Sequence, residues 1–168
     1  MKHTLVALVE NEPGVLNRVA SLFRRRNFNI DSLTVGRTES PDVSRMTIVI
    51  DSAVTDTESV EKNLYKLVNV ITVQDVTDTP LITRDMALIK VHAGDGVGDV
   101  CHDFGARIID VSSTSLIVEM SDTEDQIEQL IESLRPFGII ELVRTGAVSM
   151  GRGQNILVSP TIPALESI

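Results

Sequence analysis

The stretch Asn11-Glu12-Pro13-Gly14-Val15-Leu16 lies where an apolar run ends and a helical pattern begins. Residues 5–9 before it are all apolar, and after it apolar side chains recur at helical spacing as far as Phe23. A proline suits the first turn of a helix, where its missing N–H would have no partner, and a glycine lets a ligand approach the backbone closely. The stretch is therefore either an ordinary strand-to-helix turn or an anion site at a helix N-terminus.

The elements around this stretch follow the order of a ferredoxin-like module. We expect strands over 2–9, 30–36, 46–51 and 70–73, a helix over about 14–26, and a second helix with the apolar face Val60, Leu64, Leu67 and Val68. The first strand is apolar on both faces, which predicts a central position, and the second should lie at the sheet edge. This order predicts a four-stranded antiparallel sheet with two helices on one face.

The same order then recurs. We expect strands over 86–91, 107–111, 116–120 and 139–143, a short helix around 100–105, and a longer one with the face Ile127, Leu130, Ile131 and Leu134. The capping box Thr55-Asp56-Thr57-Glu58 returns almost letter for letter as Ser121-Asp122-Thr123-Glu124. The fold class is therefore α+β with two ferredoxin-like βαββαβ modules. The second is a degenerate copy, because its first helix is short and interrupted by glycine.

This repeat predicts four segments. They are a first domain at 1–77, a linker at 78–85 that contains Asp78-Thr79-Pro80, a C-terminal α+β domain at 86–150, and a mobile tail at 151–168 rich in glycine, serine and proline.

The composition argues against nucleic acid as a partner. Aromatic residues are 3% of the chain and tryptophan is absent, whereas base-stacking folds need aromatic platforms. The net charge of −9 repels phosphate backbones. The basic run Arg24-Arg25-Arg26 falls in the last turn of a predicted helix, where cations suit the helix dipole.

The sequence also predicts a cytoplasmic protein with no membrane association. Cys101 is the single cysteine, so no disulfide forms within the chain and a reducing compartment is expected. We find no signal-peptide pattern. Apolar stretches fall well short of the ~20 residues that a membrane helix needs.

Two features of the second module are candidate chemical sites. Gly94-Asp95-Gly96-Val97-Gly98 lacks the spacing of a dinucleotide fingerprint and the lysine of a phosphate loop, which favours a flexible loop. The metal-capable side chains nearby are Asp95, Asp99, Cys101, His102 and Asp103. They have no second Cys or His at zinc-ligand spacing, and adjacent residues such as Cys101 and His102 do not face each other on a helix. We therefore expect neither a metal site nor a catalytic centre.

The opening stretch could instead bind a free amino acid. If two copies paired along the edge strand that begins at Ile30, Asn29 of one copy could approach Gly14 of the other. Backbone N–H groups of Gly14 and Val15 would bind the carboxylate, and the amide oxygens of Asn11 and Asn29 would accept from the ammonium group. Leu16 and Ile30 would suit an aliphatic side chain. The candidate site residues are Asn11, Gly14, Val15, Leu16, Asn29 and Ile30.

Several of these stretches resemble a known family. Glu10-Asn11-Glu12-Pro13-Gly14-Val15-Leu16 is similar to the ligand loop of ACT domains. Asn27-Phe28-Asn29-Ile30-Asp31-Ser32-Leu33-Thr34-Val35 and Ser44-Arg45-Met46-Thr47-Ile48 resemble the regulatory small subunit of acetohydroxyacid synthase, also called acetolactate synthase. The resemblance runs from about residue 2 to 153 and ends in Gly151-Arg152-Gly153.

The resemblance implies a function. The domain at 1–77 would be an ACT domain for effector binding and dimerisation, and the chain would be a non-catalytic subunit that binds no cofactor. Its partner would be a catalytic large subunit that uses thiamine diphosphate, Mg and usually FAD. That subunit condenses pyruvate with pyruvate or 2-oxobutyrate, as a transferase of branched-chain amino-acid biosynthesis. The small subunit would activate it and confer feedback inhibition by valine.

Further expectations concern the effector and the alternatives. The effector would lie between two ACT domains, on Asn11, Gly14, Val15 and Leu16 of one chain and Asn29 and Ile30 of the other. Valine, leucine and isoleucine remain open, because one methylene discriminates by only ~1–3 kcal/mol. A stand-alone amino-acid-sensing ACT protein that regulates another enzyme is the main alternative, and an enzyme built on Cys101 and His102 is a third.

Overall fold

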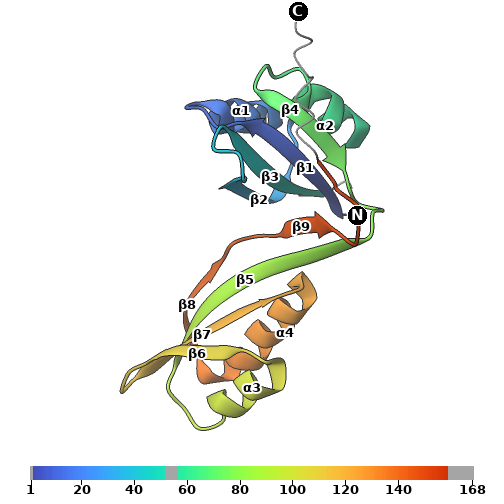
Figure 1. Cartoon of the computed structure of the whole chain (residues 1–168). Coiled ribbons are helices and arrows are strands. Elements are labelled where there is room, and N and C mark those ends of the chain that lie inside the picture. The colour runs from blue at the N-terminus through green and yellow to red at the C-terminus, as the bar shows by residue number, and fades with distance from the viewer. Residues whose placement is uncertain (1, 52–56, 159–168) are drawn as a thin grey trace, which may run out of the picture. The chain divides into compact units, whose positions relative to one another are not determined.

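A computed structural model of the chain describes residues 2–51 and 57–158 (Figure 1). Its first sheet has the strand order β2-β3-β1-β4, all neighbours antiparallel. The strands are β1 (Lys2–Glu10), β2 (Ile30–Arg37), β3 (Val43–Asp51) and β4 (Val70–Asp75), and the helices are α1 (Val15–Arg26) and α2 (Thr57–Leu64). The predictions of a central first strand and a second strand at the edge are confirmed.

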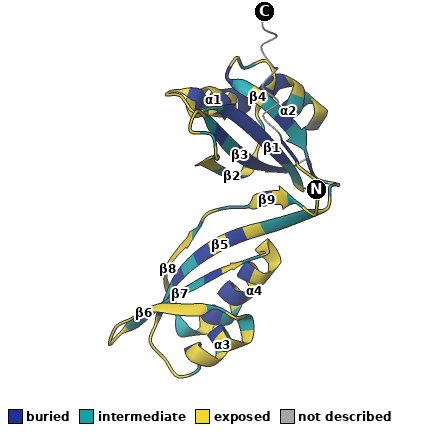
Figure 2. Ribbon diagram, in the orientation of Figure 1, coloured by how far each residue is buried: buried dark blue, intermediate teal, exposed yellow. Residues whose placement is uncertain are grey.

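The first core lies between this sheet and its two helices. Leu5, Ala7 and Val9 of β1 point into it, and each is at most 1% exposed. The α1 helix contributes Val15, Val19, Leu22 and Phe23 (Figure 2). The predicted helical face is therefore confirmed in part, because Leu16 and Ala20, which share its spacing, are exposed.

The opposite face of β1 is also covered. Val6 and Leu8 pack with Val76, and with Leu157 and Val158 from the end of the described chain. The sequence placed residues 151–168 in a mobile tail. Leu157 and Val158 of that segment instead pack on the first sheet, where they shield an apolar strand from water.

The second sheet repeats the first in its order, β6-β7-β5-β8, with β9 paired to β5. The strands are β5 (Leu81–His92), β6 (Arg107–Val111), β7 (Ser115–Asp122), β8 (Ile139–Arg144) and β9 (Val148–Gly151). The helices are α3 (Val97–Phe104) and α4 (Glu124–Leu134), followed by a 3-10 turn over Arg135–Phe137. Because β5, β6, β7 and β8 take the places of β1, β2, β3 and β4, the internal repeat and the α+β class are confirmed.

The chain divides into two compact units at places that differ from the predicted domain limits. The first unit comprises residues up to Ile82 together with the segment from Ser149, and the second comprises Thr83–Val148. Most of the predicted linker 78–85 is strand, since β5 begins at Leu81. The start of β5 was not predicted, because a polar residue such as Asp85 does not indicate a buried strand. Asp85 is buried by its ion pair with Arg144 rather than by apolar packing.

The face predicted for the second helix was partly wrong. The α2 helix ends at Leu64, and Val68 is 90% exposed. Backbone bonds shorten to three-residue turns after the helix, with Leu67 N–H donating to Leu64 O and Val70 N–H to Leu67 O. This tightening rotates Val68 away from the core.

One predicted capping box was misplaced and the other lies partly outside the described residues. Strand β7 continues through Asp122, so α4 begins at Glu124. Its N-cap is Thr123, whose hydroxyl accepts from Gln126 N–H at 3.4 Å. The cap therefore falls two residues after Ser121. In the first box, Thr55 and Asp56 are not among the described residues.

Candidate functional site

Gly14 sits at the N-cap of α1 with an open surface above it. Its φ of 85° and ψ of −8° are left-handed, a conformation that favours glycine. Its carbonyl accepts the first helical bond, from Arg18 N–H at 3.0 Å. A Cβ built on Gly14 would meet no atom within 4 Å. The space beside Gly14 is therefore open to a ligand, although the Val15 N–H already donates to Glu12 O at 3.4 Å.

Of the other predicted site residues in this loop, two side chains are accessible and one is not. Val15 is 4% exposed and packs in the core, so only its backbone can serve a ligand. Leu16 is 48% exposed. Asn11 donates from Nδ2 to the Pro41 carbonyl at 2.9 Å, which orients the amide and leaves its oxygen as the group for a ligand.

Within one chain the structure does not bring Asn29 to Gly14. Asn29 follows α1, whose 12 residues span about 18 Å, whereas Gly14 precedes it. Asn29 is exposed, and Ile30 is half-buried against the first core at the start of the edge strand β2. A site that uses both ends of α1 must therefore combine two copies of the chain.

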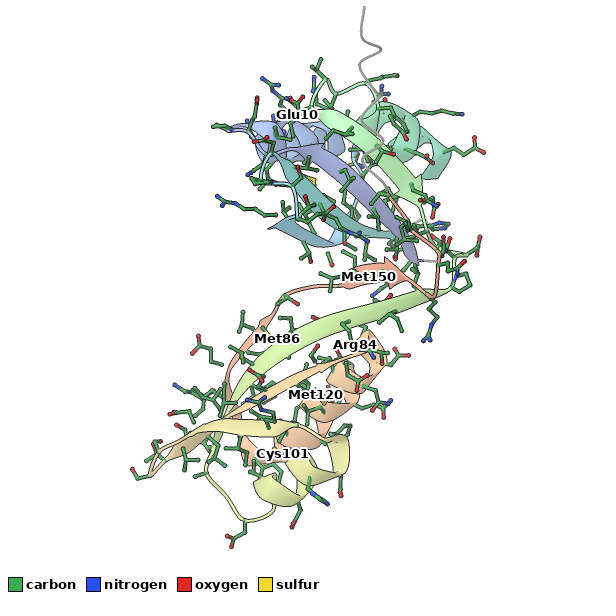
Figure 3. The ribbon with its side chains drawn as sticks, in the orientation of Figure 1. Glu10, Arg84, Met86, Cys101, Met120 and Met150 are labelled. Carbon is green, nitrogen blue, oxygen red and sulfur yellow. The ribbon has the colours of Figure 1, made fainter. Side chains whose placement is uncertain are left out.

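A polar bridge beside the loop was not predicted from the sequence. Asn69, only 7% exposed, donates from Nδ2 to the Glu10 carboxylate at 2.6 Å and accepts from the guanidinium of Arg18 (Glu10 is labelled in Figure 3). Its carbonyl also accepts from Glu10 N–H at 2.9 Å. The bridge joins the end of β1, the first turn of α1 and the turn before β4. No local spacing predicts it, because Asn69 is remote from the other two residues in the chain.

The second unit repeats the glycine loop in a covered form. Gly96 is the N-cap of α3, with φ 99° and ψ −12°, and Val97 after it is fully buried, like Val15 after Gly14. The ring of Phe137 lies 3.5 Å from a Cβ built on Gly94 and 3.6 Å from one built on Gly96. The second loop therefore has its own aromatic side chain where the first has open space.

Cys101 is a core residue. It is 3% exposed, it lies on α3 where Val19 lies on α1, and burial raises the pKa of its thiol (Figure 3). A buried, protonated thiol is a poor nucleophile. Among the described residues, no group of three or more His, Cys, Asp or Glu side chains could hold a metal ion.

The second unit also contains a part-buried ion pair that the sequence did not predict. Arg144 donates to Asp85 Oδ2 from Nε at 2.8 Å and from a terminal nitrogen at 2.6 Å, and to Glu128 at 2.9 Å. Burial lowers the pKa of Arg144, but the hydrogen bonds and charges of both carboxylates outweigh it and leave the pKa raised. Asp85 Oδ1 accepts from Gly146 N–H, so the carboxylate is fully bonded and structural.

Two family descriptions cover both units, and relatives match most of the chain. Residues 5–72 match an AHAS small subunit-like ACT domain, and residues 84–153 match the small subunit of acetolactate synthase. A probable acetolactate synthase small subunit from Archaeoglobus fulgidus is 50% identical over 158 residues, which are 91% of this chain and 98% of that one. An acetolactate synthase small subunit from Mycobacterium leprae is 50% identical over 155 residues, 90% of this chain and 92% of that one.

A solved structure agrees. The acetolactate synthase small subunit of Thermotoga maritima superposes with a TM-score of 0.85 at 37% identity, over 92% of this chain and 99% of that one. The fold and the glycine loop thus define an ACT-domain protein. More narrowly, the chain belongs to the family of acetolactate synthase small subunits. No helix within residues 2–51 and 57–158 is long and apolar enough to cross a membrane.

Proposed function

We propose that this chain is a non-catalytic regulatory subunit that activates the catalytic subunit of an acetolactate synthase and makes it sensitive to feedback inhibition by valine. The observation that carries the proposal is the open Gly14 loop at the start of α1, inside an ACT domain of this family. The helix N-terminus offers N–H donors and a partial positive charge to the carboxylate of a free amino acid. Thiamine diphosphate, Mg and FAD would belong to the catalytic subunit.

The effector site would be shared by two chains. Asn11, Gly14, Val15 and Leu16 would come from one, and Asn29 and Ile30 from the other, since α1 separates the two groups within a chain. Backbone N–H groups would bind the carboxylate, the two amide oxygens would accept from the ammonium group, and the apolar side chains would contact the aliphatic part of valine.

The homodimer needed for this site would form along β2. This strand is the edge of the first sheet, and Ile30–Arg37 contains neither proline nor lysine to discourage pairing with another chain. Pairing two sheets there would satisfy backbone groups of both edges. Sedimentation should show a dimer at micromolar concentration, and a clean monomer would contradict the shared site.

Reconstitution tests the proposed function. The catalytic subunit is assayed for acetolactate with and without this chain, and then with valine, leucine or isoleucine added. We expect the chain to raise the rate and valine to lower it again. An unchanged rate, together with failure to co-purify with the catalytic subunit, would favour a stand-alone amino-acid sensor. Acetolactate formed by the chain alone with thiamine diphosphate and Mg would refute a non-catalytic role.

A further inference from the structure

The turn before β4 in the first unit and the turn before β8 in the second occupy the same place in their sheets. Glu10 N–H donates to Asn69 O at 2.9 Å in the first, and His92 N–H donates to Gly138 O at 3.1 Å in the second. The next paired residues are Val9 with Val70 and Val91 with Ile139, each following a register shift. Asn69 therefore corresponds to Gly138.

One residue earlier, Val68 corresponds to Phe137. The Phe137 ring packs over the Gly94 and Gly96 positions at 3.5–3.7 Å. This contact shows that an apolar side chain at this place in the turn can reach the N-cap glycine of the helix that follows the first strand.

In the first unit the same place is unfilled. Val68 is 90% exposed, and nothing lies within 4 Å of a Cβ built on Gly14. The turn is nevertheless held against the loop, because the Asn69 side chain bonds both Glu10 and Arg18. An exposed valine on an anchored turn is an apolar side chain without a packing role in the free chain.

We propose that Val68 is a specificity-determining residue of the effector site, where it contacts the aliphatic side chain of the bound amino acid. The inference rests on the proposed function, since it extends the site at Gly14 to a residue outside the loop and outside β2. The bound side chain fills the space that Phe137 fills in the second unit. Effector binding then shields Val68 from water, which stabilises the complex.

The test is to copy the second unit's arrangement into the first. Valine binding to the full chain is measured by calorimetry for the wild type, Val68→Phe, Val68→Ala and the matched control Val111→Phe, an exposed valine of β6 in the other unit. Val68→Phe should fill the space and weaken valine binding at least about tenfold, the effect of about one methylene in an apolar pocket. Val68→Ala should reduce the preference for valine over alanine, and Val111→Phe should bind as the wild type does.

Gly14→Asp separates failure of this inference from failure of the proposed function. If the wild type binds valine, Gly14→Asp does not, and both Val68 variants bind with wild-type affinity and selectivity, Val68 has no role in the site and the inference is overturned. If the wild type binds no branched-chain amino acid, or Gly14→Asp binds valine normally, the proposed site itself fails and the inference fails with it. Circular dichroism should show all variants folded, since Val68 and Val111 are exposed and a Cβ at Gly14 meets no atom within 4 Å.

Discussion

The two glycine loops of this chain have similar backbone conformations, but one is open to solvent and the other is covered by a side chain. Gly14 and Gly96 both cap a helix in the left-handed region, and each is followed by a buried valine. Above Gly14 there is open space, whereas the second loop is covered by Phe137. The backbone alone therefore does not define a ligand site, because a side chain from a distant turn decides whether the helix N-terminus is accessible.

The anchoring of the neighbouring turn differs in the same way. In the first unit Asn69 bridges Glu10 and Arg18 by hydrogen bonds. In the second, Gly138 occupies that place, and a Cβ built on it would lie 2.9 Å from the His92 ring. The Asn69 bridge holds the first turn and leaves the Gly14 loop open. In the second unit the Phe137 ring packs on the Gly94 and Gly96 positions, so the same contact holds the turn and covers the loop.

Among the substitutions that test this comparison, Gly14→Asp should have the largest effect, a loss of valine affinity at the open loop. Two carboxylates ~4 Å apart at an effective dielectric near 20 repel by ~4 kcal/mol, which is roughly a thousandfold in affinity. Feedback inhibition by valine should be lost, as measured by inhibition of the reconstituted synthase. Gly14→Asn is the matched control, because Asn resembles Asp in shape and in its tolerance of positive φ but has no charge. Inhibition of the Asp variant at the wild-type valine concentration would place the site elsewhere.

Phe137→Ala should have the next largest effect, a loss of stability of the second unit. Phe137 is half-buried against the second core, so we expect a loss of about 2–3 kcal/mol in unfolding free energy, below the value for a fully buried ring. Urea unfolding measures the change. The corresponding Val68→Ala should change stability by less than about 0.5 kcal/mol, since that residue is exposed. Equal losses at both positions would remove the contrast between the turns.

Asn69→Ala should destabilise the first unit by about 1–2 kcal/mol, because it leaves the part-buried partners Glu10 and Arg18 without their shared amide. Thermal unfolding is the measurement, with Asn17→Ala on the exposed side of α1 as the control. A melting temperature unchanged by Asn69→Ala would mean that the bridge does not hold the turn.

The smallest effect is expected at Cys101 and Val19, which occupy equivalent core positions on α3 and α1. A thiol at either position should react slowly in the folded chain. Burial raises the pKa of the Cys101 thiol, so its thiolate fraction at neutral pH lies below that of a free cysteine and grows only as the pH rises. A disulfide reagent should label native Cys101 slowly at pH 7 and faster after unfolding. Cys101→Ser should leave activation of the synthase unchanged. A cysteine introduced at Val19, in a chain lacking Cys101, should be similarly inert, and rapid labelling of either would contradict the equivalence of the two positions.

The start of α1 at Gly14 was predictable because it is local. Pro13 and Gly14 between an apolar run and a helical pattern indicate a helix N-terminus. The left-handed conformation of Gly14 was not predicted, because an N-cap residue usually has extended dihedral angles. The Asn69 bridge and the exposure of Val68 were not predictable from the sequence. The helical spacing assigned Val68 to a buried face, but three-residue turns after Leu64 rotate it into solvent.

By itself the sequence determined the order of the elements, the duplication of one α+β plan, the central first strand and the helix start at Gly14. These follow from local periodicity, turn chemistry and glycine geometry. Only the tertiary structure decided that Phe137 covers the second loop, that Asp85 is buried against Arg144, and that Leu157 and Val158 shield the far face of β1. Each of these contacts joins residues distant in the chain, and no local pattern records which distant side chain fills a space.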